Sequence, residues 1–296
     1  AGGVPRPIRF STPTFKDYAS TELKGCSKNS FPSFSITAGA CGLNCDHCRA
    51  EILKPMLAAT SPAMLDQKVR HLIATQDLQG FLLSGGSNRR NEIPYERFYP
   101  VVERLKRDFP QLNIAIHTAL TDEAGARAME AAGVDTAMMD VIGADATIRE
   151  VYHLDRPVAD FEATLAALTA TSMKVSPHIV IGLHYGRVLG EANALDIVSR
   201  YPVEALVLVV VMPFYAAPGL FAVPDAAEVG RIFGEARRRL PDRQVLLGCA
   251  RPPGLHKRAV DAYAVMAGLD GIAFPADGVV GVARAIGRPF HQEHAC

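Results

Sequence analysis

The sequence predicts an α/β protein built as a (β/α)8 barrel of the TIM type. From residue 33 onward, short β-branched runs alternate with amphipathic helical stretches, a pattern typical of a parallel sheet covered by helices. Eight such runs fall within about 250 residues, the usual length of one such barrel. Hydrophobic residues make up 49% of the 296 residues, which is enough to form one large core.

The predicted strands are aliphatic or β-branched runs bounded by turn residues. Two of the helices between them have clear boundaries. One begins with Ser61 as its cap and Pro62 in its first position, and another begins with Thr121 as its cap and ends at Gly133. In chain order, the predicted strands are 33–38, 80–86, 113–118, 135–141, 174–183, 205–212, 244–249 and 271–275.

We expect one domain with two short extensions. Residues 33–287 would form the barrel, because no linker or low-complexity tract interrupts them. Residues 1–32 are expected to be an irregular N-terminal extension that carries Cys26. Residues 288–296 form a C-terminal tail that ends in Cys296.

The composition excludes several classes of protein. Lysine plus arginine equals aspartate plus glutamate at 31 each, and no long run of one sign indicates a nucleic-acid surface. There is no apolar segment long enough to span a membrane, and no signal peptide at the start, so a cytoplasmic location is expected. Six cysteines in such a chain are expected to be reduced and able to bind a metal.

Three cysteines lie within eight positions directly after the first predicted strand. Cys41, Cys45 and Cys48 have the spacing C-x3-C-x2-C in "CGLNCDHC", and active sites of such barrels lie at this end of the strands. Thiolate ligands favour an iron-sulfur cluster or zinc. A structural zinc site needs four protein ligands, whereas this loop offers three thiolates and His47. A zinc knuckle remains the alternative to a catalytic cluster with one open position.

The cysteine motif resembles the signature of the radical S-adenosylmethionine (SAM) superfamily. In that superfamily, three cysteines hold three irons of a [4Fe-4S] cluster, and SAM chelates the fourth iron through its amino and carboxylate groups. The resemblance implies that Cys41, Cys45 and Cys48 are the cluster ligands. It also implies reductive cleavage of SAM to a 5'-deoxyadenosyl radical that abstracts hydrogen from an unactivated carbon. An electron donor such as ferredoxin or flavodoxin would be needed.

Two further segments resemble the SAM-binding parts of that superfamily. In "LLSGGSN", Gly85 and Gly86 are similar to a glycine pair whose backbone approaches the amino group of SAM. Most members have a glutamate directly after this pair, where Ser87 stands here. His47 takes the place before the third cysteine that is often aromatic and lies near the adenine.

Later strands carry weaker resemblances. The segment "VIGLHYGRVLGE" is similar to the one that packs against adenine through the backbone, which implies Ile181 and Gly182. In "VVVMPF", Met212 and the proline after it resemble a segment that borders the substrate. His117 and Asp140 end the third and fourth strands, where they would contact the SAM ribose or the substrate, or serve only as structural residues at the rim.

The complete barrel resembles the biotin synthase-like subgroup, and the segment beginning "LGCARPPGLHKRAV" resembles two-component lipoyl synthases. This implies sulfur insertion, with a partner radical SAM subunit and an octanoylated lipoyl domain. Cys26, Cys249 and Cys296 would then ligate an auxiliary iron-sulfur cluster, with Arg251 or His256 nearby. The alternatives are a carbon-skeleton or methyl-transfer reaction without sulfur insertion, and a non-catalytic zinc-binding barrel.

Overall fold

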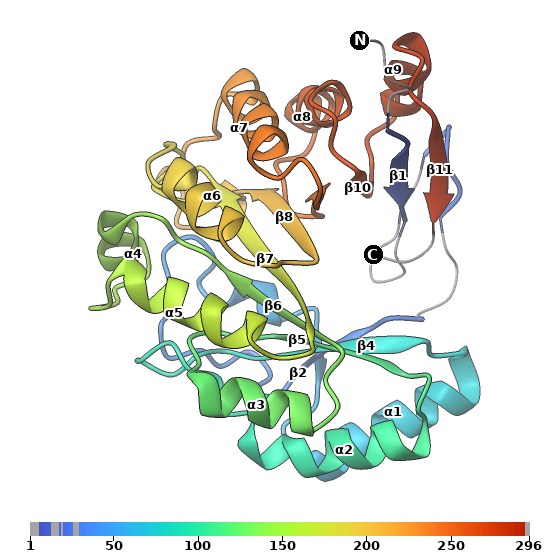
Figure 1. Cartoon of the computed structure of the whole chain (residues 1–296), viewed down its shortest axis with the longest axis vertical. Helices are drawn as coiled ribbons and strands as arrows, with labels where there is room; N and C mark the ends of the chain where they lie inside the picture. Colours follow the sequence, from blue (N-terminus) through green and yellow to red (C-terminus); the bar gives the residue numbers. More distant parts are fainter. Residues whose placement is uncertain (1–5, 13–17, 19, 26–29, 294–296) are drawn as a thin grey trace.

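The chain folds as one parallel sheet that curls into a half-barrel, with helices on its outer face (Figure 1). The structure is a computed structural model that describes residues 6–12, 18, 20–25 and 30–293. The sheet has eleven strands in the order β11-β1-β10-β9-β8-β7-β6-β5-β4-β2-β3. The strands are β1 (Ile8–Ser11), β2 (Ser33–Ser35), β3 (Leu57–Ala58), β4 (Gly80–Ser84), β5 (Asn113–His117), β6 (Thr136–Asp140), β7 (Lys174–Ile181), β8 (Ala205–Val210), β9 (Gln244–Leu247), β10 (Gly271–Ala273) and β11 (Phe290–Glu293).

Helices connect the strands in the predicted alternation, and the predicted fold class is confirmed. Ser61 caps α1 through a hydrogen bond from the Met64 amide, as expected, but α3 is capped by Asp122 rather than by Thr121. The α-helices are α1 (Pro62–Gln76), α2 (Tyr99–Asp108), α3 (Glu123–Ala131), α4 (Asp145–Val151), α5 (Val158–Thr169), α6 (Glu191–Ser199), α7 (Ala226–Arg239), α8 (Leu255–Met266) and α9 (Val279–Ala285), and the short 3-10 turns are η1 (Glu51–Leu53), η2 (Glu96–Phe98) and η3 (Pro213–Tyr215). None of the helices described here has both the length and the apolar character that crossing a membrane requires.

The two extensions are more regular than expected. Each contributes a strand to the sheet: β1 pairs in parallel with β10 on one side and with β11 on the other. In Figure 1 these strands lie beside the last helices, at the opposite edge of the sheet from β2 and β4. The N-terminal segment is therefore part of the half-barrel wall, not a wholly irregular extension.

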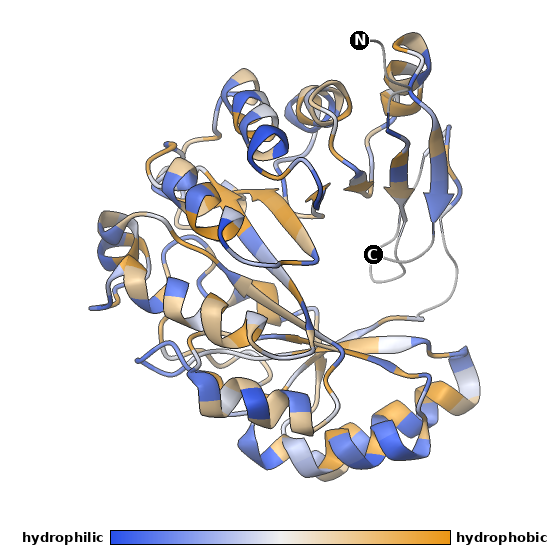
Figure 2. Cartoon of the chain, viewed as in Figure 1, coloured by the Kyte–Doolittle hydropathy of each residue, from blue (hydrophilic) through white to orange (hydrophobic). Residues whose placement is uncertain are grey.

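The two faces of the sheet have different environments. Along β7, Pro177, Ile179 and Ile181 are buried, whereas the alternate residues Ser176 and His178 are only half-buried. Because alternate side chains point to opposite faces, the first set packs under the outer helices and the second set faces the lumen of the half-barrel. Strand β8 is strongly apolar in Figure 2, as a sheet with helices packed on it requires, whereas β11 at the edge is largely hydrophilic.

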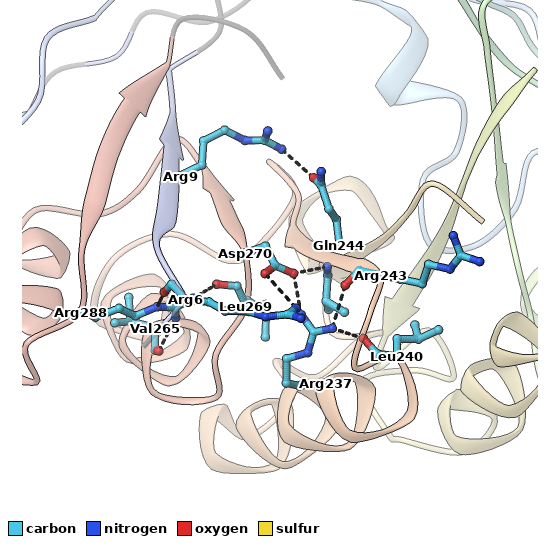
Figure 3. Close-up of polar contacts among 11 residues, drawn as sticks. Arg6, Arg9, Arg237, Leu240, Arg243, Gln244, Val265, Leu269, Asp270 and Arg288 are labelled. Carbon is cyan, nitrogen blue, oxygen red and sulfur yellow. Dashed lines mark hydrogen bonds and ion pairs between the residues drawn. The ribbon is translucent and has the colours of Figure 1, made fainter. Parts of the chain in front are cut away.

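Arginines fix the N-terminal end of the half-barrel (Figure 3). Asp270, just before β10, forms an ion pair with Arg237 of α7 at 2.6 Å. It also accepts a hydrogen bond from the Val245 amide at 2.8 Å. Arg288 donates to the backbone carbonyl of Arg6 at 2.8 Å. These contacts join both ends of the described chain to the last strand-helix units, which leaves the opposite, C-terminal end of the strands for a site.

Candidate active site

The cysteine loop follows β2 at the C-terminal end of the strands. Cys45 is buried, and Cys41 and Cys48 are half-buried. The loop turns tightly because the amide of Arg49 donates to the Cys45 carbonyl at 2.8 Å, and Arg49 itself has a φ of 46°. Such left-handed residues outside glycine are uncommon and mark a constrained turn.

The thiols of Cys45 and Cys48 hydrogen-bond to each other. This bond is the main reason why the pKa of Cys45 is raised and the pKa of Cys48 is lowered. When the pair loses one proton, the negative charge therefore lies mainly on Cys48. Cys41 instead lies with its Sγ 3.8 Å from the backbone carbonyl of Ser87. The pKa of buried Tyr152 is raised by burial first and then by the charges of Asp140 and the three cysteines. All three thiols therefore lie within electrostatic range of the Tyr152 hydroxyl.

His47 belongs to the cysteine loop and contacts Tyr152. Its ring stacks on Tyr152, with the centroids 5.1 Å apart and the planes at 24°. Burial of the ring opposes its protonation, but the hydrogen bond to Cys48 and the charge of Cys48 outweigh this and raise the pKa of His47. Its Nδ1 is buried without a hydrogen-bond partner, which is costly unless a ligand supplies one.

Gly86 packs directly against the cysteine loop. A Cβ on Gly86 would lie 2.0 Å from the Ala40 carbonyl oxygen and 2.7 Å from Cα of Cys41. Its amide donates to Thr37 Oγ1 at 2.7 Å. A Cβ on Gly85 would lie 2.8 Å from a side-chain carbon of Ile36. The glycine pair is thus needed for close contact between β4 and the loop after β2, in addition to any role in ligand binding.

Asp46, inside the cysteine motif, ties the loop to two other segments. Its backbone amide donates to the Val151 carbonyl at 2.9 Å. Its carboxylate lies 2.9 Å from Nε2 of His153 and accepts a hydrogen bond from the Tyr185 hydroxyl at 3.1 Å. Sequence reasoning missed this contact set, because the three side chains come together only in the folded chain.

Three polar side chains extend the site into the lumen. His117 Nε2 lies 3.9 Å from Asp140 Oδ1, and the ring centroids of His117 and His178 are 5.4 Å apart. Asp140 and His178 are direct neighbours in the register of β6 and β7. His178 was not predicted, although the alternation along its strand places it on the same face as Ser176. His117 and Asp140 were predicted together, and the structure brings them together.

The segment that resembles an adenine-binding segment begins at the end of β7. Ile181 is fully buried, and Gly182 has a φ of 78° and donates its amide to Glu191 Oε1 at 2.7 Å. A Cβ on Gly182 would lie 2.3 Å from Cγ of Pro224, so only glycine fits here without displacement. A small open recess lies beside this segment and is lined in part by Ile142, Thr147, Val180, Leu183 and His184.

The remaining predicted residues are only partly described. Met212 is half-buried two residues after the end of β8, and Pro213 begins η3. Cys26 and Cys296, two of the three expected ligands of the auxiliary iron-sulfur cluster, lie outside the described residues. Cys249 is half-buried after β9.

The two side chains expected beside that auxiliary set have protein partners. Arg251 is completely buried and forms two hydrogen bonds to Asp261, at 2.6 and 3.0 Å, so it is not free to contact a cluster or a substrate. His256 Nε2 is used in a 2.8 Å hydrogen bond to the Pro224 carbonyl.

The donor set of the loop fits a cluster held by three thiolates, because soft sulfur ligands are those that iron-sulfur clusters take. Within residues 6–12, 18, 20–25 and 30–293, no group of three or more His, Cys, Asp or Glu side chains is placed to enclose a metal ion as it stands.

The fold is shared with radical SAM enzymes. Methylornithine synthase (PylB) superimposes with a TM-score of 0.56 at 12% identity, covering 91% of this chain and 72% of that one. The hydrogenase maturase HydG from Carboxydothermus hydrogenoformans gives 0.57 at 15% identity, covering 90% of this chain and 58% of that one. SuiB of Streptococcus suis, bound to its precursor peptide SuiA, gives 0.57 at 13% identity, covering 81% of this chain and 52% of that one.

These similarities concern the fold, since the identities are low. The chain spans only slightly more than half the length of HydG and of SuiB. No protein-family model matches the sequence, and no curated protein matches it.

Proposed function

We propose that this chain is a radical SAM enzyme. The observation that carries the proposal is the position of the C-x3-C-x2-C loop: it follows the first strand of the alternating β/α region, in a half-barrel with the fold of radical SAM enzymes. Cys41, Cys45 and Cys48 would hold a [4Fe-4S] cluster with one open iron for SAM. The cluster would supply the electron that cleaves SAM to methionine and the 5'-deoxyadenosyl radical, with ferredoxin or flavodoxin as the external donor.

The residues around the loop would bind and orient SAM. Gly85 and Gly86 leave backbone exposed to its amino group, and Ile181 and Gly182 offer backbone to its adenine. His47, stacked on Tyr152, has a buried Nδ1 without a partner and is well placed for a polar group of the nucleoside. The curved wall of strands would exclude water from the reacting carbon.

The lumen side would hold the ribose or the substrate. His117 and Asp140 would face it from β5 and β6, and Met212 would border it beyond β8. The proposed catalytic unit is residues 33–287, flanked by 1–32 and 288–296. These flanks supply β1 and β11, so we include them in the folding unit.

For the reaction itself, we propose sulfur insertion of the kind that biotin synthase and lipoyl synthase perform. The support is Cys249, a half-buried thiol just beyond the C-terminal end of β9. The cysteine loop also follows the C-terminal end of its strand, β2, in the same parallel sheet. With Cys26 and Cys296 it would ligate an auxiliary iron-sulfur cluster. A partner radical SAM subunit and an octanoylated lipoyl domain belong to this proposal. The alternative is a carbon-skeleton or methyl-transfer reaction on a small molecule.

Iron analysis separates the two reactions. After anaerobic reconstitution, sulfur insertion requires about eight irons per chain, falling to about four in Cys249→Ala. A parent protein that never exceeds about four irons would favour the alternative without sulfur insertion. Colourless protein with one zinc per chain would instead identify a non-catalytic zinc-binding barrel.

A further inference from the structure

His178 and Asp140 are neighbouring polar side chains on the lumen wall. They are register neighbours on β6 and β7, so their side chains lie side by side on the same face. Beside the Asp140 carboxylate lies His117, whose Nε2 is 3.9 Å from Oδ1. That distance is too long for a hydrogen bond, which leaves the carboxylate without a close donor from His117.

The His178 ring lacks a partner of its own. Its Nδ1 is buried and makes no hydrogen bond. Burial, and then the neighbouring His117, lower the pKa of His178 to about 4, so the ring is neutral near pH 7. A neutral imidazole has one N–H, and in the tautomer that carries it on Nε2, Nδ1 is an acceptor.

The site therefore combines one negative charge with two acceptors that need donors. A carboxylate or phosphate group would be repelled by Asp140 and would bring no proton to Nδ1. A hydroxyl has a single proton and would leave one acceptor unpaired. A protonated primary amine has three N–H donors and a positive charge, so it can satisfy both side chains at once.

The surroundings indicate what the amine is attached to. On β8, the lumen neighbour of His178 is Val207, and Val209 continues the same face. On β6, Met138 lies two residues before Asp140 on the lumen face. Aliphatic side chains thus flank the polar pair on both strands, and they fit an aliphatic carbon frame.

We propose that Asp140 and His178 bind the protonated amine of an aliphatic substrate, and hold its carbon frame in the lumen below the cysteine loop. This inference rests on the proposed function, because a radical formed at the cysteine loop must have its substrate close by. SAM also carries an ammonium group, so the test has to separate the two sources of positive charge.

Binding of hexylamine to the reconstituted protein tests the site, with hexanol and hexanoate as probes of the same length. We expect saturable binding of hexylamine, and at least tenfold weaker binding of the other two. Asp140→Asn and His178→Gln should each weaken hexylamine binding about tenfold, as expected for one charge-assisted or one buried hydrogen bond. The matched controls are Asp242→Asn and His71→Gln, two exposed residues that should leave it unchanged.

Hexanoate binding as tightly as hexylamine, or unchanged affinity in both lumen variants, would overturn the proposal. A second measurement determines the affinity for SAM in the absence of hexylamine. If Asp140→Asn weakens SAM binding as much as it weakens hexylamine binding, the pair serves SAM and the substrate assignment is wrong. Iron content is measured on the same samples. A parent protein with four irons but no amine binding contradicts this inference alone, whereas amine binding by an iron-free protein supports the amine site and contradicts the proposed function.

Discussion

The carboxylate of Asp46 accepts a hydrogen bond from the hydroxyl of Tyr185, 139 residues later in the chain, at 3.1 Å. The Glu150 carbonyl oxygen lies 3.0 Å from the same hydroxyl, so the two acceptors share its single proton. Asp46 lies between two cysteines of the motif, and Tyr185 lies in the segment after β7 that we assign to adenine. The loop that would hold the cluster and the segment that would hold SAM are therefore connected by one side-chain contact.

Removing that hydroxyl should loosen the cysteine loop. In Tyr185→Phe, the amides of residues 41–50 should exchange with deuterium faster, and the free energy of unfolding should fall by about 1 kcal/mol, the usual loss for one hydrogen bond. Tyr201→Phe is the control, since its hydroxyl donates to Glu162 at 3.0 Å on another part of the surface. Equal exchange of the loop in the parent and in Tyr185→Phe would show that the contact does not position it.

Gly86→Ala should displace the cysteine loop. The added Cβ would overlap the Ala40 carbonyl and the Cys41 backbone, neither of which is the flexible end of a side chain. We therefore expect lower iron content after reconstitution as well as weaker SAM binding, both measured on the same preparation. Gly234→Ala in α7 is the control, because a Cβ there meets nothing within 4 Å. Full iron occupancy in Gly86→Ala would limit the role of this glycine to SAM binding.

His178 should make the stability of the fold depend on pH. Its pKa is about 4 in the folded chain against 6.5 for the free side chain, so the unfolded state binds the proton more tightly. The contribution to stability is complete above about pH 6.5 and is lost as the pH falls toward 4. Because the residue is only half-buried, we expect a loss on the order of 1 to 3 kcal/mol, less than the full shift implies.

The measurement is urea unfolding at pH 7.5 and pH 5. The loss of stability between the two should be smaller in His178→Gln than in the parent, while the exposed His71→Gln should behave as the parent does. The same pH dependence in all three proteins would contradict the depressed pKa of His178.

The ion pair between Arg251 and Asp261 should be essential for folding of the last strand-helix units. Both side chains are completely buried, and Asp261 also accepts a hydrogen bond from the Ala276 amide at 2.7 Å. Asp261→Ala leaves a buried guanidinium without its charge partner, which should lower the free energy of unfolding by about 3 to 5 kcal/mol. Urea unfolding beside Asp242→Ala, an exposed control, measures this loss. A cost below about 1 kcal/mol would show that water compensates the arginine.

The sequence was sufficient for the eight central strands, because each is a short aliphatic run with helical periodicity on both sides. It was not sufficient for β1 and β11. Their residues, IRFS and FHQE, follow prolines and contain polar side chains, and their pairing with each other joins opposite ends of the chain. No local pattern records such a contact.

The site divides in the same way. Cys41, Cys45 and Cys48 could be identified because their spacing is local, and His117 and Asp140 because each ends a strand. The neighbours that fix them could not. Asp46 meets His153 and Tyr185 only through the curvature of the sheet, and His178 becomes notable only when its Nδ1 is seen to lack a partner.

The central claim is that three cysteines hold a cluster that cleaves SAM. The most direct test is anaerobic reconstitution of the parent and of Cys45→Ala, followed by dithionite reduction with SAM and quantification of iron, sulfide and 5'-deoxyadenosine. Cys249→Ala is the matched thiol control. The account predicts a brown parent protein that forms 5'-deoxyadenosine, continued formation in Cys249→Ala, and none in Cys45→Ala, whose circular dichroism should show an intact fold. Formation of 5'-deoxyadenosine by Cys45→Ala at the rate of the parent would contradict it.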